Sequence, residues 1–180
     1  YSLYIMISLL KKIIPLDSPI RVSYHYIRGM LAFWTSGNPT KNMIVIGVTG
    51  TKGKTTTTNI IATGLQQSGH KVAMFSTVNM MIDGKVSENN LKMTSPGPFV
   101  LWKFLREAEK AGCNYAVVET SSHALYYHRV FGLRYDVAIM TNISQDHLDL
   151  HHTMENYVQT KLQLFQNLYK YGVRKDVRKV

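Results

Sequence analysis

The sequence contains a single cysteine, Cys113, in 180 residues. One thiol cannot form a disulfide within the chain or supply a zinc site with several thiolates, and this favours a reducing cytoplasm. Long apolar runs are also missing. The stretch from Tyr1 to Leu10 is too short to span a bilayer, and its lysines follow it, whereas those of a signal peptide precede it. We therefore expect a cytoplasmic protein without an integral membrane segment.

Acidic residues are scarce, with 11 Asp and Glu against 21 Lys and Arg and a net charge of +10. Residues 1–41 carry five basic residues against one acidic residue, and so do residues 170–180. Each end therefore has a net charge of +4, which leaves a net charge of +2 for residues 42–169. Basic ends suit RNA or an anionic membrane surface, or they are solvated tails that attract an anionic substrate. We favour solvated tails and expect no nucleic-acid partner.

A glycine-rich segment follows the apolar run 43–46. Residues 47–56 are Gly-Val-Thr-Gly-Thr-Lys-Gly-Lys-Thr-Thr, which predicts a strand, a turn and a helix N-terminus. The backbone N–H groups of such a turn bind a polyphosphate, and Lys54 and Thr55 stand where a P-loop has its phosphate-binding lysine and magnesium-binding hydroxyl. A standard P-loop has glycine at the position of Val48. The segment is therefore an unusual P-loop or a chance glycine-rich turn.

Hydrophobic periodicity predicts alternating strands and helices. The predicted strands are 43–48, 71–76, 115–119 and 136–141, with a hairpin over 77–86 around Asp83-Gly84. The predicted helices are 20–34, 54–68, a segment from the loop 94–98 to Ala111, 122–128 and 154–169. This order predicts an α/β fold, with a P-loop-type, mostly parallel sheet and helices on both faces. Ligands of such sheets lie at the carboxyl ends of the strands.

The N-terminal region forms a segment of its own in this prediction. Ser18-Pro19 is typical of a helix start. The helix that follows has five apolar residues on one face: Ile20, Tyr24, Ile27, Leu31 and Trp34. We expect residues 1–41 to form a basic, amphipathic helical segment and residues 42–180 to form the nucleotide-binding domain.

Two further groups lie at or beyond the ends of predicted strands. Glu119 ends a buried strand and can hold magnesium beside the P-loop, or it can bond a helix N-terminus as a structural residue. His147 is a candidate metal ligand that Asp146 would orient. Because His151 and His152 follow, a zinc site is an alternative, although the chain lacks the cysteines of most such sites.

Lys161 lies in the middle of an apolar stripe on the last predicted helix. A lysine on an inward face needs a partner or a changed charge state. Alternatively its stem lies along the core and its amine reaches outward to solvent. Spacing alone favours the outward amine.

Three motifs together resemble one family. They are Gly-Thr-Lys-Gly-Lys-Thr-Thr (50–56), Glu-Thr-Ser-Ser-His-Ala-Leu (119–125) and Asp-His-Leu-Asp-Leu-His (146–151), followed by Tyr157 and Lys161. This combination resembles the central domain of the Mur ligases, and most of all the MurE-type tripeptide synthetases. The resemblance extends from about residue 44 to residue 165. The combination is specific, although no single motif is.

The resemblance implies an ATP-dependent amide ligase of peptidoglycan synthesis. The carboxylate of UDP-N-acetylmuramoyl-L-alanyl-D-glutamate would attack the γ-phosphate of ATP to give an acyl phosphate. The amine of a third amino acid, meso-diaminopimelate or lysine, would then displace phosphate. Because two anions must meet, a lysine and two magnesium ions would offset their repulsion.

The resemblance also assigns roles by position. The ATP-binding residues would be Gly50, Thr51, Lys52, Gly53, Lys54, Thr55, Thr56 and Asn142. Thr55 and Glu119 would bind the first magnesium ion, and His147 and a carbamylated Lys161 the second. Carbamylation would turn the inward lysine into an anionic ligand, which we prefer to an outward amine. The substrate-binding residues would be Thr94, Ser95, Ser121 and Arg129, and the catalytic residues Lys54, Glu119, His147 and Lys161.

The sequence departs from the family pattern in several places. Tyr127 stands where tripeptide synthetases often have glutamine, and only about forty residues precede the P-loop. The resemblance further predicts a domain cut short at its C-terminal end. Rival interpretations are a folylpolyglutamate synthase-like ligase, a ligase that modifies lipid-linked muropeptides, and a non-catalytic ATP-binding module that needs a partner. An RNA-binding P-loop ATPase is a more distant alternative.

Overall fold

The computed structural model describes residues 15–89 and 96–170. Within these residues six strands form one sheet in the order β4-β3-β2-β5-β1-β6. The strands are β1 (Ile44–Thr49), β2 (Val72–Phe75), β3 (Asn79–Ile82), β4 (Lys85–Glu88), β5 (Tyr115–Glu119) and β6 (Val137–Met140). β1, β2, β5 and β6 are parallel, whereas β3 pairs antiparallel with β2 and β4. The predicted mostly parallel α/β sheet is confirmed.

The helices agree with the predicted segments within a few residues. They are α2 (Pro19–Ser36), α3 (Lys54–Gln67), α4 (Pro98–Lys110), α5 (Ser122–Tyr126), α6 (Leu148–His151) and α7 (Met154–Lys170), with a 3-10 turn η1 (Pro39–Asn42). The sequence did not predict α6 or η1, because a four-residue turn is too short for hydrophobic periodicity to register. None of the described helices is long and apolar enough to cross a membrane.

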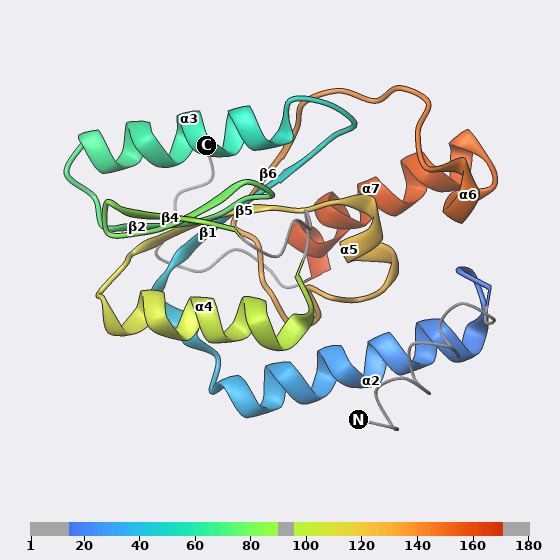
Figure 1. Ribbon diagram of the computed structural model, residues 1–180, viewed down its shortest axis with the longest axis horizontal. Coiled ribbons are helices and arrows are strands. Elements are labelled where there is room, and N and C mark those ends of the chain that lie inside the picture. Colours follow the sequence, from blue (N-terminus) through green and yellow to red (C-terminus); the bar gives the residue numbers. More distant parts are fainter. Residues whose placement is uncertain (1–14, 90–95, 171–180) are drawn as a thin grey trace.

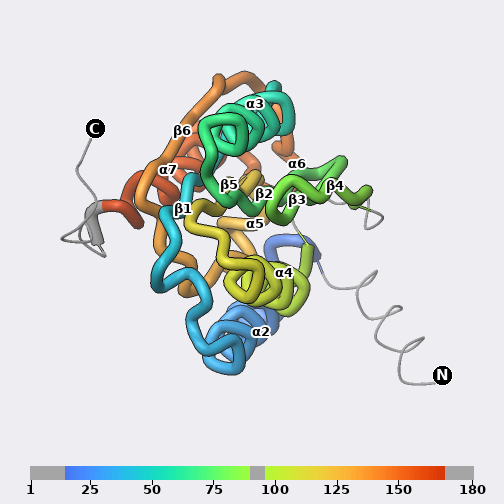
Figure 2. Tube along the Cα trace, turned by 90° about the vertical axis from the view of Figure 1, so that its left-hand side faces the viewer, coloured from blue at the N-terminus to red at the C-terminus, as the bar shows by residue number. Residues whose placement is uncertain are grey.

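The helices cover both faces of the sheet, as predicted. α3 lies on one face, while α4 lies on the other with α2 outside it (Figure 1). Alternate residues of β1 point into two cores, so Ile46 and Val48 meet the α3 side, while Val45 lies in the core with Leu105 of α4 and Leu164 of α7. The stacked order of α3, sheet, α4 and α2 is also visible from the side (Figure 2).

The apolar stripe of α2 is its exposed face. Ile20 and Trp34, at its two ends, are 70% and 72% exposed. The packed face carries small residues instead, including Gly29 and Ala32. A Cβ on Gly29 would lie 2.5 Å from the carbonyl oxygen of His128, so only glycine lets α2 approach the turn after α5 this closely.

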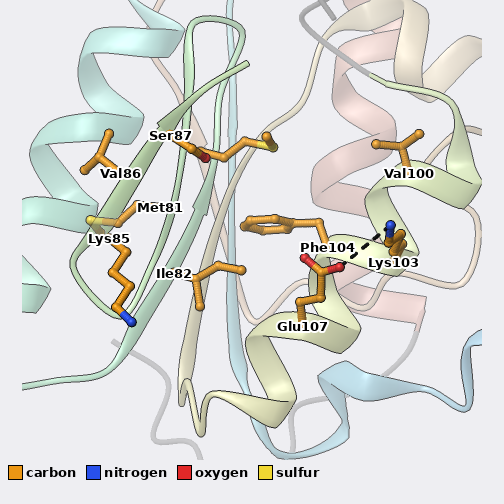
Figure 3. A pocket seen from close by; sticks show the side chains of 10 residues that line it. Met81, Ile82, Lys85, Val86, Ser87, Val100, Lys103, Phe104 and Glu107 are labelled. Atoms are coloured by element: carbon orange, nitrogen blue, oxygen red, sulfur yellow. Dashed lines mark ion pairs between the residues drawn. The ribbon is translucent and has the colours of Figure 1, made fainter. Parts of the chain in front are cut away.

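The predicted hairpin at Asp83-Gly84 is confirmed as β3 and β4. Asp83 and Gly84 both have positive φ, 48° and 78°, which is typical of the two-residue turn that matches strand twist. A pocket of about 430 Å³ lies between this hairpin and α4. Ile82 and Phe104 point toward each other across it, beside the Lys103–Glu107 ion pair (Figure 3). No predicted site residue lines this pocket.

Candidate active site

The glycine-rich loop joins β1 to α3 at the carboxyl edge of the sheet. Gly50 and Gly53 have φ values of 145° and 78°, in the region that favours glycine. A Cβ on Gly50 would overlap the hydroxyl oxygen of Thr141. The loop therefore needs glycine for its backbone conformation and for its close approach to the chain after β6. Thr56 follows in the first turn of α3 and is exposed.

Lys54, the first residue of α3, folds back over the loop. Its Nζ donates a hydrogen bond to the carbonyl oxygen of Thr51 at 2.8 Å. Burial lowers the pKa of Lys54, and the negative charges of Glu119 and Asp146 partly offset this effect. Burial destabilises the charged form of Lys54, and an anion would stabilise it. Lys54 is therefore suited to binding an anionic ligand beside this loop.

Glu119 lies at the end of β5 and faces the start of α3. Its Oε2 accepts hydrogen bonds from the hydroxyl of Thr55 at 3.0 Å and from the backbone N–H of Thr77 at 2.8 Å. Its Oε1 accepts from the hydroxyl of Thr77 at 2.9 Å. Thr77 was not among the predicted site residues, although its position just beyond the carboxyl end of β2 was a usable signal. The hydroxyl of Thr55 and the carboxylate of Glu119 are the oxygen donors that magnesium prefers.

The segment after β6 is hydrogen-bonded to the glycine-rich loop. Asn142 accepts a hydrogen bond from the backbone N–H of Lys52 and donates one to its carbonyl oxygen, both at 3.0 Å. The hydroxyl of Thr51 donates to the carbonyl oxygen of Ser144 at 3.1 Å and accepts from its N–H at 3.0 Å. Asn142 therefore holds the backbone of the glycine-rich loop at Lys52.

Lys161 on α7 is buried, with 1% of its surface exposed. Its amine donates a hydrogen bond to the carbonyl oxygen of Gly50 at 2.7 Å, so the outward amine expected from spacing alone is wrong. The amine also lies 4.6 Å from the ring centroid of Tyr157, whose hydroxyl is 3.1 Å from the hydroxyl of Thr51. Burial first, and the charge of Lys54 second, lower the pKa of Lys161 to about 8.

His147 lies beside this cluster in a strained turn. It has a φ of 52°, and its Nε2 is 3.6 Å from Asp146, the expected orienting carboxylate. Its ring lies 4.6 Å from that of His123 and 6.4 Å from that of Tyr157. Burial, with the charge of His147 next, lowers the pKa of His123 to about 4 and keeps this imidazole neutral.

The other two histidines of the zinc alternative have separate partners. His151 is buried with its Nδ1 3.4 Å from the hydroxyl of Thr160, and His152 pairs with Asp17 at 3.0 Å. Within the described ranges, no three His, Cys, Asp or Glu side chains are grouped closely enough to hold a metal ion. The described residues therefore give the zinc alternative no support.

The predicted substrate-binding residues are only partly described. Thr94 and Ser95 lie outside the described residues. Ser121 caps α5, and its hydroxyl accepts a hydrogen bond from the N–H of Ala124 at 3.2 Å. Arg129 follows α5, with its guanidinium 5.5 Å from the ring centroid of Tyr127. It lines a small cavity together with Glu119, so these two predicted site residues lie close to each other.

These residues lie within a recognised family domain. The sequence model of the Mur ligase middle domain matches residues 48–175. The chain belongs to the Mur ligase family. The matched range contains every residue that the sequence analysis assigned to the site, whereas α2 lies outside it.

Similar proteins come from several bacteria. A protein of Parabacteroides distasonis is 39% identical over 140 residues, which are 78% of this chain and 28% of that protein. One of Bacillus cereus is 40% identical over 157 residues, which are 86% of this chain and 32% of that protein. Both are named UDP-N-acetylmuramoyl-L-alanyl-D-glutamate--2,6-diaminopimelate ligase. The chain thus spans about a third or less of these Mur ligases.

Solved structures show the same architecture. A structure of UDP-N-acetylmuramoyl-L-alanyl-D-glutamate--2,6-diaminopimelate ligase matches with a TM-score of 0.67 and 30% identity, over 78% of this chain and 29% of that one. E. coli FolC, solved in complex with DHPP and ADP, matches with a TM-score of 0.62 and 20% identity, over 83% and 44%. The second likeness is one of fold alone.

Proposed function

We propose that this chain is the ATP-binding part of an amide ligase that extends UDP-N-acetylmuramoyl-L-alanyl-D-glutamate by one amino acid. The observation that carries the proposal is the contact between the buried amine of Lys161 and the glycine-rich loop at Gly50. A buried lysine beside a phosphate-binding loop can serve this reaction, because carbamylation would turn its amine into an anionic ligand for magnesium. The names of the relatives favour diaminopimelate as the added amino acid over lysine.

In this proposal residues 42–180 form the central ATP-binding domain and residues 1–41 a separate N-terminal segment. Residues 50–56 and Asn142 hold the phosphates of ATP. Thr55 and Glu119 hold the first magnesium ion, and the 3.0 Å between their oxygens supports a shared ligand. The lone Cys113 is buried, which suits a protein of the reducing cytoplasm.

His147 and Lys161 would hold a second magnesium ion. The neutral amine of Lys161 attacks carbon dioxide, a nitrogen–carbon bond forms, and the nitrogen loses a proton to leave a carbamate. A pKa of about 8 makes the neutral amine available close to neutral pH. Bound magnesium would neutralise phosphate charge during the transfer.

The ligation itself follows in two displacements. A carboxylate oxygen of the muramoyl dipeptide attacks the γ-phosphorus, and ADP leaves with the electron pair of the broken bond. Lys54 stabilises the charge that develops on the phosphate oxygens. The incoming amine then attacks the acyl carbon, phosphate leaves, and the amine nitrogen loses a proton. Thr94, Ser95, Ser121 and Arg129 would orient the dipeptide.

The test measures ADP release with MgATP, the UDP-muramoyl dipeptide and either diaminopimelate or lysine. It compares the 180-residue chain with a longer version extended beyond Val180. We expect turnover in the extended protein and its loss in the Lys54→Met variant. Zero turnover in both proteins with both amino acids would refute the ligase assignment.

A further inference from the structure

The exposed face of α2 is apolar along its whole length. Five large side chains, spaced three or four positions apart, form what we call the α2 stripe: Ile20, Tyr24, Ile27, Leu31 and Trp34. Between 43% and 72% of the surface of each is exposed. α2 is the outermost layer of the fold, on the far side of α4 from the sheet (Figures 1 and 2). A contiguous apolar stripe on an outer helix marks an interaction surface.

Basic groups accompany the α2 stripe. The guanidinium carbon of Arg28 lies 5.4 Å from the ring centroid of Tyr24, so this cation borders the stripe. At the C-terminal end of α2, the guanidinium of Arg106 donates a hydrogen bond to the carbonyl oxygen of Thr35 at 2.6 Å. α2 contains no acidic residue, and residues 18–82 contain neither Asp nor Glu. The charge along α2 is therefore positive.

This combination of side chains favours a lipid surface over another protein chain. Tyr and Trp rings are enriched where a bilayer meets water, because they join an apolar body to a polar group, and the stripe contains one of each, Tyr24 and Trp34. Anionic headgroups would attract the arginines, whereas a second copy of α2 would bring like charges together. Charge alone favoured a solvated segment, but the exposed stripe adds the apolar contact that a membrane surface requires.

We propose that α2 binds the surface of an anionic lipid bilayer, with the α2 stripe at the acyl-chain boundary and Arg28 and Arg106 among the headgroups. This membrane contact goes beyond the proposed ligase function. α2 would lie in the plane of the interface, as amphipathic helices with aromatic and basic residues do. α3, which follows the glycine-rich loop, lies on the other face of the sheet, so a surface that contacts α2 does not cover α3 (Figure 1).

The test measures the fluorescence of the 180-residue chain mixed with vesicles of phosphatidylglycerol or of phosphatidylcholine. Trp34 is exposed, whereas Trp102, the other tryptophan, is buried, so a blue shift of the emission reports on the stripe. We expect this shift with phosphatidylglycerol, together with quenching by lipids brominated on their acyl chains. Phosphatidylcholine should bind at least about tenfold more weakly, because each basic residue near an anionic surface contributes about 1 kcal/mol.

Substitutions in the full chain separate the apolar from the electrostatic contribution. The double variant Ile27→Ser/Leu31→Ser should lower vesicle binding in cosedimentation by at least about tenfold, because it removes apolar surface from the stripe. Arg28→Gln should weaken binding to phosphatidylglycerol by about fivefold and leave binding to phosphatidylcholine unchanged. The matched control is Ile60→Ser, at an isoleucine of α3 that is 67% exposed, and it should bind like the wild type. Far-UV circular dichroism checks that each variant is folded.

Several results would overturn the proposal. One is Trp34 emission that phosphatidylglycerol vesicles leave unchanged. Another is a blue shift that grows with protein concentration in the absence of lipid, which would identify a second copy as the partner of the stripe. Emission that is already blue-shifted without lipid at every concentration would show that another part of the chain covers the stripe. Equal loss of vesicle binding in Ile60→Ser and in Ile27→Ser/Leu31→Ser would show that α2 is not the contact.

Discussion

Burial of the Lys161 amine has a measurable cost in stability. The pKa of this amine is about 8 in the folded protein against an ordinary value of 10.5. A difference of about 2.5 in pKa corresponds to about 3.4 kcal/mol at a pH below both values. Lys161 is only 1% exposed, so solvent screening does not reduce this figure substantially.

The sign follows from proton binding. Between pH 8 and 10.5 the unfolded chain keeps the proton on Lys161 while the folded chain releases it, so the free energy of unfolding rises with pH. About 2 kcal/mol of this rise falls between pH 7.5 and 10. Lys161→Met removes the titrating group and should remove that part of the rise.

The assay is urea denaturation at several pH values in buffer free of carbon dioxide. The wild type should gain about 2 kcal/mol more than Lys161→Met between pH 7.5 and 10. Lys103→Met, at an exposed lysine, should follow the wild type and serves as the control. Equal pH dependence in the wild type and Lys161→Met would show that the amine is not buried as described. Added ¹³C-bicarbonate should give a carbamate carbon signal in the wild type and in Lys103→Met but not in Lys161→Met.

Two further substitutions test the loop and its support. Gly50→Ala forces a Cβ onto the hydroxyl of Thr141 at a φ of 145°. We therefore expect a destabilisation of at least about 1–3 kcal/mol in urea denaturation. We also expect a loss of MgATP binding in calorimetry. Tyr157→Phe removes the buried hydrogen bond to Thr51 and should lower the free energy of unfolding by about 1 kcal/mol, with weaker MgATP binding.

Each of these has a matched control. Gly64→Ala lies inside α3 with no atom within 4 Å of the added Cβ, and it should be neutral or stabilising by up to about 1 kcal/mol. Tyr115→Phe removes a hydroxyl from the start of β5 and should leave MgATP binding unchanged. Gly50→Ala as stable as the wild type would contradict the close packing of the loop, and unchanged stability of Tyr157→Phe would contradict the link between α7 and the loop.

Much of the fold was predictable, because the relevant signals are local. The apolar run before Gly47, the turn at Asp83-Gly84 and the helix start at Lys54 depend on neighbouring residues only, and all three are confirmed. On α2 the predicted helix is confirmed, but its apolar stripe faces solvent and its packed face consists of small residues. Periodicity detects which residues share a helix face but not which face packs against the rest of the protein.

The sequence by itself determined the glycine-rich loop between strand and helix, the α/β class and the motifs that resemble the Mur ligases, since each depends on consecutive or regularly spaced residues. Only the tertiary structure decided that the amine of Lys161 turns inward to the carbonyl of Gly50, 111 positions earlier, and that Thr77 shares Glu119 with Thr55. Such contacts depend on strand order and helix docking, which bring together residues far apart in the chain and leave no periodic trace in the sequence.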